Sequence, residues 1–238
     1  MSRNETPDAA PAPSPAPAPA PDDFHAVLRS LRVWDTELPG FDAGAAPAEP
    51  VVLFREWFVH AAAAGQVEPH TMSLATVDEE GRPDVRTLML HDADGRGWHF
   101  ASHATSAKGR QLAARPRAAL GFYWPAVARQ VRVRGRVTTG SPEESRADLA
   151  VRSRGALAAA LTGHQSEVLG SVQELAEASA AAWERAGAEP DAPAPTWTAY
   201  VLDADEVEFF QGDATRRHVR LRYRRTPEGG WTRELLWP

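Results

Sequence analysis

Short, strand-like segments separated by turn residues fill residues 72–137, and no other feature of the sequence constrains the fold as strongly. Each segment is bounded by Gly, Pro or Asp, which is the pattern of short β-strands joined by turns. Residues 85–91 and 97–102 flank the turn-like Asp92-Ala93-Asp94-Gly95 and are predicted to pair as a hairpin. The run predicts strands at residues 71–77, 85–91, 97–102, 118–124 and 130–137.

Helical signals surround this run. Residues 50–64 give the clearest helix, because Pro50 is acceptable in a first turn, Gly65 follows the end, and aromatic residues share one face. Ser141-Pro142-Glu143-Glu144 and Ser171-Val172-Gln173-Glu174 are capping boxes that predict helices over 142–152 and 172–187. Four further strands are predicted at residues 198–202, 206–211, 219–225 and 230–236. Mostly antiparallel strands with peripheral helices predict an α+β fold of barrel type.

The N-terminal part of the chain differs in composition from the rest. Residues 1–23 contain an Ala-Pro alternation that lacks a backbone donor at every second position and lacks large apolar groups, so they are predicted to be a disordered tail. Residues 24–49 are predicted to form an extended arm, and residues 50–238 a single domain.

Composition excludes several classes of function. The formal charge of −6 argues against a nucleic-acid partner, and the sequence contains no run of about 18 apolar residues that would predict a membrane span. With no cysteine, the chain cannot form a disulfide or use a thiolate, and we expect a cytoplasmic protein. The spacing of His91, His99 and His103 is too irregular to predict a metal site. Common nucleotide, zinc and hydrolase motifs do not occur.

One stretch combines the residues that an anion needs. Hydroxyl-bearing residues, including Ser102, precede a short helical pattern that contains Lys108 and stops before Pro116. The first amide N–H groups of a helix have no intrahelical partner and can donate to phosphate oxygens. Arg86, on a predicted strand, could add a planar two-pronged donor. The alternative is an ordinary helix cap and a solvated arginine.

Other polar residues allow two interpretations each. Residues 130–137 alternate, with arginines on one face, which is either a solvated face or a binding stripe. Arg216-Arg217-His218-Val219-Arg220 is either a solvated turn or a clamp for an anionic or planar substrate. Gln130, Gln165 and Ser166 lie in apolar neighbourhoods, where ordinary backbone pairing is the simplest explanation.

Taken together, these positions resemble the pyridoxamine 5′-phosphate oxidase family, the FMN-dependent split-barrel oxidases, over residues 50–238. Five colinear segments carry the resemblance: Ala75-Thr76-Val77-Asp78 with Gly81-Arg82-Pro83, Val85-Arg86-Thr87-Leu88, Ser106-Ala107-Lys108-Gly109, Arg129-Gln130-Val131, and Phe209-Phe210-Gln211-Gly212 followed by Arg216 to Arg220. The resemblance implies an antiparallel split β-barrel with peripheral helices, and a homodimer with two FMN sites at the subunit interface.

The resemblance also implies a role for each matching residue. Arg86 and Lys108 would hold the FMN phosphate, with Ser102 near it. Residues that would line or contact the flavin are Thr87, Leu88, Met89, Gln130 and Phe210, and the other subunit would add Gln165, Ser166 and Arg220. The sequence departs from the family where Ala107 replaces an arginine and Phe210 replaces a tryptophan.

The substrate side departs further from the family pattern. Where vitamin-forming oxidases hold the substrate phosphate with a lysine, a tyrosine, an arginine and a serine, this chain has His91, Asp148, Arg152 and Ala156. An aspartate facing a phosphate would repel it. The two residues that would embrace the substrate ring over the flavin, Arg216 and His218, are both present and are the predicted catalytic pair, with His91 and Arg152 as further substrate-binding residues.

This combination resembles the branch of the family that oxidises reduced heteroaromatic intermediates, as in phenazine biosynthesis. The resulting hypothesis is an FMN oxidase that takes a hydride from a small reduced heteroaromatic or amine substrate and passes the electrons to O₂. Two alternatives stay open: a pyridoxine or pyridoxamine 5′-phosphate oxidase, and a non-catalytic flavin-binding module.

Overall fold

The computed structural model describes residues 23–34 and 37–238. The predicted disordered tail, apart from Asp23, lies outside the described residues. The helices are α1 (Phe24–Ser30), α2 (Pro50–Ala63), α3 (Ala107–Ala114), α4 (Pro142–Ala150), α5 (Arg154–Thr162) and α6 (Val172–Ala188), with a 3₁₀ turn η2 (Pro125–Val127). The strands are β1 (Thr71–Val77), β2 (Pro83–Met89), β3 (Asp92–Asp94), β4 (Gly97–His103), β5 (Arg117–Trp124), β6 (Arg129–Thr139), β7 (Trp197–Gln211), β8 (Val219–Arg225) and β9 (Trp231–Leu236).

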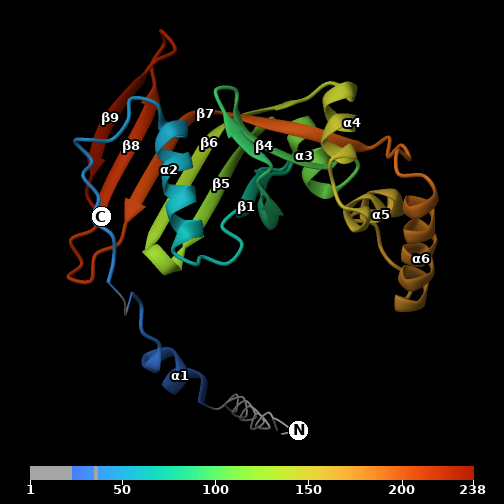
Figure 1. Cartoon of the computed structure of the whole chain (residues 1–238), viewed down its shortest axis with the longest axis horizontal. Coiled ribbons are helices and arrows are strands. Elements are labelled where there is room, and N and C mark those ends of the chain that lie inside the picture. The colour runs from blue at the N-terminus through green and yellow to red at the C-terminus, as the bar shows by residue number, and fades with distance from the viewer. Residues whose placement is uncertain (1–22, 35–36) are drawn as a thin grey trace, which may run out of the picture.

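All strand pairings within the described residues are antiparallel, in the order β2-β1-β5-β6-β7-β4-β3. The 15-residue strand β7 pairs along one edge with β6, while its other edge pairs first with β4 and then with β8. The β8–β9 hairpin therefore departs from the sheet at one end of the molecule, and helices α4 to α6 gather toward the other end (Figure 1). This architecture confirms the predicted α+β fold with an antiparallel split barrel and peripheral helices.

The predicted hairpin between residues 85–91 and 97–102 is wrong. Strand β2 pairs instead with all of β1, from Thr71 opposite Met89 to Val77 opposite Pro83. The backbone N–H of Leu90 donates to His70 and that of His91 donates to His99, so the chain crosses from one neighbour to the other at this point. The real hairpin partner of β4 is the three-residue β3. Pairing with the whole of β1 across a tight turn gives the backbone N–H and C=O groups of β2 more hydrogen bonds than the predicted pairing would.

Strand β7 also corrects a prediction, because residues 198–202 and 206–211 belong to one continuous strand. The polar Asp203-Ala204-Asp205 segment looks like a turn in the sequence, yet it stays paired with β6. A register shift between Arg134 and Gly135 absorbs the irregularity, as a β-bulge does.

The helices follow their capping signals. The box at Ser141 and Glu144 is formed in full at the start of α4, and Ser171 caps α6 by accepting from the backbone N–H of Glu174. Helix α5 was not predicted, although Ser153 caps it by accepting from Ala156 at 3.2 Å. Helix α1 lies within the segment predicted as an extended arm, and none of its residues is buried.

Helix α2 lies across the sheet and carries the centre of the core (Figure 1). Phe54 and Trp57 are almost fully buried and meet aromatic side chains of the sheet edge-on. Burying each such side chain contributes about 1.5–3 kcal/mol to folding. Other large residues in this core are Met72, Leu74, Phe100, Leu120, Phe122, Trp124, Leu202, Phe209 and Tyr223. A smaller apolar cluster joins α4, α5 and α6.

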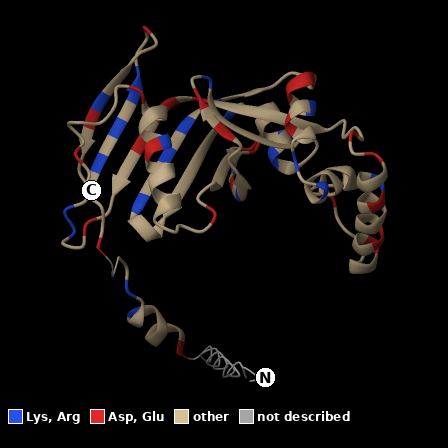
Figure 2. Ribbon diagram, in the orientation of Figure 1, with Lys and Arg blue, Asp and Glu red and all other residues tan. Residues whose placement is uncertain are grey.

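The predicted arginine face of β6 forms ion pairs with β7. Arg132 pairs with Glu208, and Arg134 pairs with Glu206 at 3.4 Å. Basic residues of β6 and β8 produce the blue bands across this end of the sheet in Figure 2. Because the side chain of Arg134 is 64% exposed, its pair contributes little to stability. Separately, none of the helices in the described part of the chain is long and apolar enough to cross a membrane.

Candidate cofactor and substrate site

The start of helix α3 gathers hydroxyl groups around an ammonium. Ser106 caps the helix by accepting from the backbone N–H of Gly109 at 3.2 Å, and it is fully buried. Lys108 Nζ lies 3.3 Å from the hydroxyl oxygens of both Ser102 and Ser106. Strand β4 supplies Ser102 and α3 supplies Lys108, so the predicted pair is brought together by the packing of α3 beside the sheet.

Arg86 reaches the same region from strand β2. Its Nη1 donates to the backbone oxygen of Leu74 at 3.1 Å and to the hydroxyl of Thr76, both on β1. Its Nη2 donates to Gln111 Oε1 of α3 at 3.1 Å and pairs with Asp84. The Arg86 side chain is only 18% exposed, so it is held in place rather than free in solvent.

The electrostatics of this group favour an anion. Burial and the positive charge of Arg86 lower the pKa of Lys108 below the ordinary lysine value. The 46%-exposed carboxylate of Asp84 offsets part of the Arg86 charge. The Lys108 ammonium, two hydroxyls, the remaining Arg86 charge and a helix N-terminus are still a donor set that suits a phosphate. Gly109 permits this arrangement, since a Cβ there would lie 2.3 Å from the backbone oxygen of Ala104. The residues present therefore fit the phosphate end of FMN, and we call this group (Arg86, Ser102, Ser106, Lys108) the anion cradle.

Gln165 and Ser166 lie beside the anion cradle of their own chain. The hydroxyl of Ser166 accepts from the backbone N–H of Ala107, the first residue of α3, at 3.1 Å. Gln165 Nε2 donates to the backbone oxygen of Ala159, while its buried Oε1 has no hydrogen-bond partner among the described residues. Within one chain, the loop after α5 therefore folds back onto the start of α3. That the other subunit adds Gln165 and Ser166 to the FMN site stays a prediction.

The predicted flavin-lining residues occupy an edge of the sheet. Strand β2 pairs only with β1 among the described strands, which leaves its outer backbone groups available to a ligand. Thr87 and Met89 are exposed there, and Leu88 packs against the core. Gln130 lies at the start of β6, paired with Tyr123 on one side and Phe210 on the other.

The predicted substrate residues near α4 form a closed network. Asp148 Oδ1 accepts from Arg152 Nη2 at 2.7 Å, and Oδ2 accepts from Arg152 Nε and from Trp197 Nε1, each at 3.0 Å. His91 Nδ1 lies 2.9 Å from Asp148 Oδ1. Burial raises the pKa of Asp148, but hydrogen bonds from His91, Arg152 and Trp197 outweigh burial and lower the pKa below the ordinary aspartate value. The carboxylate therefore stays ionised and neutralises Arg152.

The predicted catalytic pair lies on the loop between β7 and β8. His218 Nδ1 accepts from the backbone N–H of Asp213 at 3.1 Å, and its ring lies 5.1 Å from that of Phe210. Trp34 of the arm meets His218 edge-on at 5.1 Å, and the Arg216 guanidinium lies 5.8 Å from the Trp34 ring. Arg216 has a positive φ of 68°, an uncommon backbone conformation for arginine.

Arg220 completes this second group on β8. Its guanidinium pairs with the buried carboxylate of Glu208 at 2.9 Å and donates to the backbone oxygen of Trp237 at 2.6 Å. These contacts fix the side chain on the sheet surface next to the catalytic loop.

A single chain does not bring the two groups together. The loop bearing Arg216 and His218 adjoins β8 at one end of the molecule, whereas the Asp148 network belongs to α4, toward the other end (Figure 1). The site residues predicted for one pocket thus lie in two separate groups in each chain. We call His91, Asp148 and Arg152 the substrate half-site, and Arg216, His218 and Arg220 the catalytic half-site. A second copy could join one half-site to the other.

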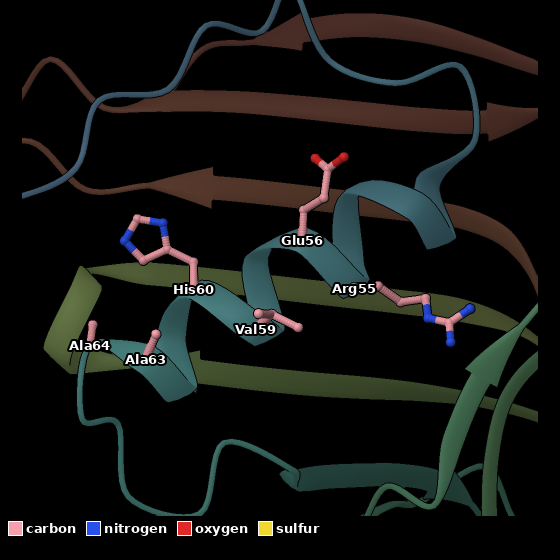
Figure 3. A pocket seen from close by; sticks show the side chains of 6 residues that line it. All are labelled: Arg55, Glu56, Val59, His60, Ala63 and Ala64. Atoms are coloured by element: carbon pink, nitrogen blue, oxygen red, sulfur yellow. The ribbon is translucent and has the colours of Figure 1, made fainter.

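A cavity lies next to the half-site that contains Arg216 and His218. A cavity of about 470 Å³ lies between the arm, residues 37–41, and the catalytic loop, including Gly212 and Arg217. A larger open groove of about 850 Å³ follows the outer face of α2, but its lining side chains, such as Arg55, Glu56 and His60, point in different directions (Figure 3). The α2 groove contains none of the predicted site residues.

Several residues of the site were missed by sequence reasoning. Asp84 and Arg86 lie two apart on a strand and hence on one face, a signal that could have identified the pair. Thr76 and Gln111 approach Arg86 from elements distant in sequence, and Trp34 approaches His218 from the arm. No local pattern indicates those contacts. Within the described ranges, no group of His, Asp or Glu is arranged to hold a metal ion.

Comparisons with known proteins identify the family of the chain. Residues 59–185 match the family model of pyridoxamine 5′-phosphate oxidase, and residues 197–238 match the C-terminal dimerisation region of pyridoxine 5′-phosphate oxidase. The chain is similar to pyridoxine/pyridoxamine 5′-phosphate oxidases of Pseudomonas fluorescens (strain SBW25), with 44% identity over 84% of this chain and 93% of the relative, and of Azotobacter vinelandii, with 45% identity over 86% and 95%.

A solved structure gives a second comparison. PhzG from Burkholderia lata 383, in complex with tetrahydrophenazine-1-carboxylic acid, superposes with a TM-score of 0.79 at 30% identity. The match covers 86% of this chain and 98% of that protein.

Proposed function

The chain belongs to the pyridoxamine 5′-phosphate oxidase family, and on this premise we propose that it oxidises a small reduced heteroaromatic or amine substrate that carries no phosphate group. FMN is its cofactor, and the anion cradle suits the FMN phosphate. Residues 197–238 match a dimerisation region, which supports a homodimer in which one half-site of each chain faces the other half-site of its partner.

The substrate assignment rests on the carboxylate of Asp148, both oxygens of which are hydrogen-bonded within the protein. Arg152 donates from both Nε and Nη2 to Asp148, so these two N–H groups cannot bind a phosphate in a bidentate way. A phosphate placed here would also meet the negative charge of the aspartate. Counting histidine as neutral, the network carries no net charge, which favours a neutral or singly charged substrate group. The ligand named for PhzG has a carboxylic acid and no phosphate, in agreement with this assignment.

The residues of the chain bind and orient the reactants in this proposal. Bound FMN supplies the hydride acceptor, and O₂ takes the two electrons and two protons to give hydrogen peroxide. Arg216 holds a planar substrate by stacking and hydrogen bonding, and His218 orients the substrate or moves a proton. Since the Nδ1 atom of His218 accepts from Asp213, the neutral ring carries its proton on Nε2, which is available as a donor. Trp34 and Phe210 pack against the His218 ring and hold it in place.

The visible spectrum of the purified protein tests the proposal. Pyridoxine 5′-phosphate and a panel of dihydro-heteroaromatic acids are added separately without oxygen. We expect a flavin spectrum that stays oxidised with pyridoxine 5′-phosphate and bleaches with a member of the panel. Prompt bleaching by pyridoxine 5′-phosphate overturns the substrate assignment. A protein that takes up no FMN overturns the oxidase itself, and bound flavin that nothing reduces favours a non-catalytic flavin-binding module.

Pyridoxine or pyridoxamine 5′-phosphate oxidation is the second candidate, favoured by the 44–45% identity to proteins of that name. A double variant separates the two candidates. Asp148→Tyr with Ala156→Ser restores residue types that the resemblance assigns to the substrate phosphate and frees Arg152. If the wild-type pocket excludes phosphate, this variant should raise kcat/KM for pyridoxine 5′-phosphate by about tenfold or more. If the wild-type protein is already a vitamin-pathway oxidase, the change should lower it or leave it unaltered.

A further inference from the structure

Arg129 is a buried cation outside both half-sites. It opens strand β6, is 4% exposed, and stacks on Trp57 of α2 with its guanidinium carbon 4.2 Å from the ring centroid. Burial lowers the pKa of Arg129 to about 10, so the side chain is still charged at neutral pH. No carboxylate pairs with it among the described residues. Its Nε donates to Gln211 Oε1 at 2.8 Å.

Gln211, the last residue of β7, is held in one orientation. Its Nε2 donates to the backbone oxygen of Val127 at 3.1 Å and to that of Gly212 at 3.2 Å. With the amide nitrogen facing two carbonyls, Oε1 must face the Arg129 guanidinium. Gln211 is itself 4% exposed, so a lost partner could not be replaced by bulk water.

The peptide group between Gly212 and Asp213 connects Gln211 to His218. Its carbonyl oxygen accepts from Gln211 Nε2, and its N–H donates to His218 Nδ1 at 3.1 Å. The backbone N–H of Gly212 also donates to Ala128 at 2.7 Å. A Cβ at position 212 would lie 2.8 Å from the Cβ of Ala128, so only glycine allows the loop to pack this closely. One peptide plane therefore sets both the position and the tautomer of His218.

We propose that Arg129 is a positioning residue that fixes the predicted catalytic histidine through Gln211 and the Gly212–Asp213 peptide. The relay runs from the Arg129 guanidinium to the Gln211 amide, then to the peptide plane, and ends at His218 Nδ1. It holds the His218 proton on Nε2, because Nδ1 accepts from the peptide. The catalytic meaning of this relay rests on the proposed function, whereas the structural relay does not.

The test combines nitrogen NMR of the imidazole with kinetics on the FMN-loaded protein. Arg129→Met keeps the packing on Trp57 but removes the donor, Arg129→Lys restores a donor, and Gln211→Met breaks the relay one step later. Arg134→Met, on the same strand but 64% exposed, is the matched control. His218→Asn identifies the signal of His218 among the eight histidines. Thermal unfolding selects the variants that fold.

In the wild type, the Arg134→Met control and Arg129→Lys, we expect the His218 tautomer with the proton on Nε2. In Arg129→Met and Gln211→Met we expect a mixture of tautomers and a kcat reduced about tenfold to a hundredfold with FMN affinity unchanged. A folded Arg129→Met or Gln211→Met protein with the wild-type tautomer overturns the relay. If the tautomer changes while no substrate is turned over by the wild type, the relay holds and the proposed function fails.

Discussion

The guanidinium of Arg152 holds the carboxylate of Asp148 through two hydrogen bonds, from Nε to Oδ2 at 3.0 Å and from Nη2 to Oδ1 at 2.7 Å. The carboxylate side chain is 17% exposed, so the pair is only weakly screened by solvent. The Arg152 cation therefore stays in the substrate half-site, but the Asp148 carboxylate neutralises its charge. It makes Asp148 the residue that distinguishes this pocket from one built to bind a phosphate.

Asp148→Asn should lower stability in a pH-dependent way. Because the folded-state pKa of Asp148 is depressed, its contribution is present above the ordinary aspartate value of 3.8 and is lost as pH falls through the folded-state pKa. At pH 7 we expect the variant to be less stable by about 1–3 kcal/mol, and the difference from wild type should shrink below pH 3.8. Urea unfolding across pH measures it. Asp205→Asn, which breaks an exposed pair with Arg117, should change stability little, and a difference independent of pH would contradict the argument.

Arg86→Met should weaken FMN binding. The variant removes a charge-assisted donor from the anion cradle while Lys108 remains, so we expect the FMN Kd to rise about tenfold to a hundredfold. Quenching of flavin fluorescence during titration measures the Kd. Arg82→Met provides a control, because Arg82 is 73% exposed and its ion pairs are with nearby Asp78 and Glu80. Equal FMN affinity in both variants would exclude Arg86 from the cofactor site.

Arg216→Ala should separate turnover from cofactor binding. If Arg216 holds the substrate and not the flavin, kcat/KM should fall about tenfold to a hundredfold while FMN occupancy stays at the wild-type level. Arg224→Ala is the control, since Arg224 lies on β8 outside the cavity, is 56% exposed and pairs with Glu206 at 3.8 Å. Steady-state kinetics and the flavin-to-protein absorbance ratio give the two readouts. Loss of flavin in proportion to activity would contradict the assigned role.

Gly109→Ala should damage both the fold and the anion cradle. A Cβ there would lie 2.3 Å from the backbone oxygen of Ala104 and 2.5 Å from that of His103, so α3 would have to move away from the sheet. We expect a loss of about 1–3 kcal/mol in stability and weaker FMN binding. Gly121→Ala adds a Cβ with its nearest neighbour at 3.9 Å and should be neutral or slightly stabilising. Thermal unfolding and FMN titration compare the pair, and similar behaviour of both variants would contradict the close approach of α3.

Local patterns in the sequence were sufficient for many of the elements, although they missed α5 and divided β7 into two strands. The capping box at Ser141 starts α4, the aromatic stripe that includes Phe54 and Trp57 is the buried face of α2, and the segment between residues 225 and 231 turns the chain from β8 into β9. The resemblance identified the family and FMN before any geometry was known. The capping box, the aromatic stripe and the turn each depend on residues close together in the chain, where spacing alone specifies the physical outcome.

Contacts between distant segments were decided only by the tertiary structure. Whether β2 pairs with β1 or with β4 depends on which partner forms more backbone hydrogen bonds with it. The alternation of residues within one strand does not indicate that partner. The sequence by itself determined which residues could bind a phosphate or hold a substrate. Packing decided that Ser166 returns to α3 of its own chain, that Asp148 neutralises Arg152, and that Arg129 reaches His218 through Gln211, because those energies exist only once segments far apart in the chain are folded against each other.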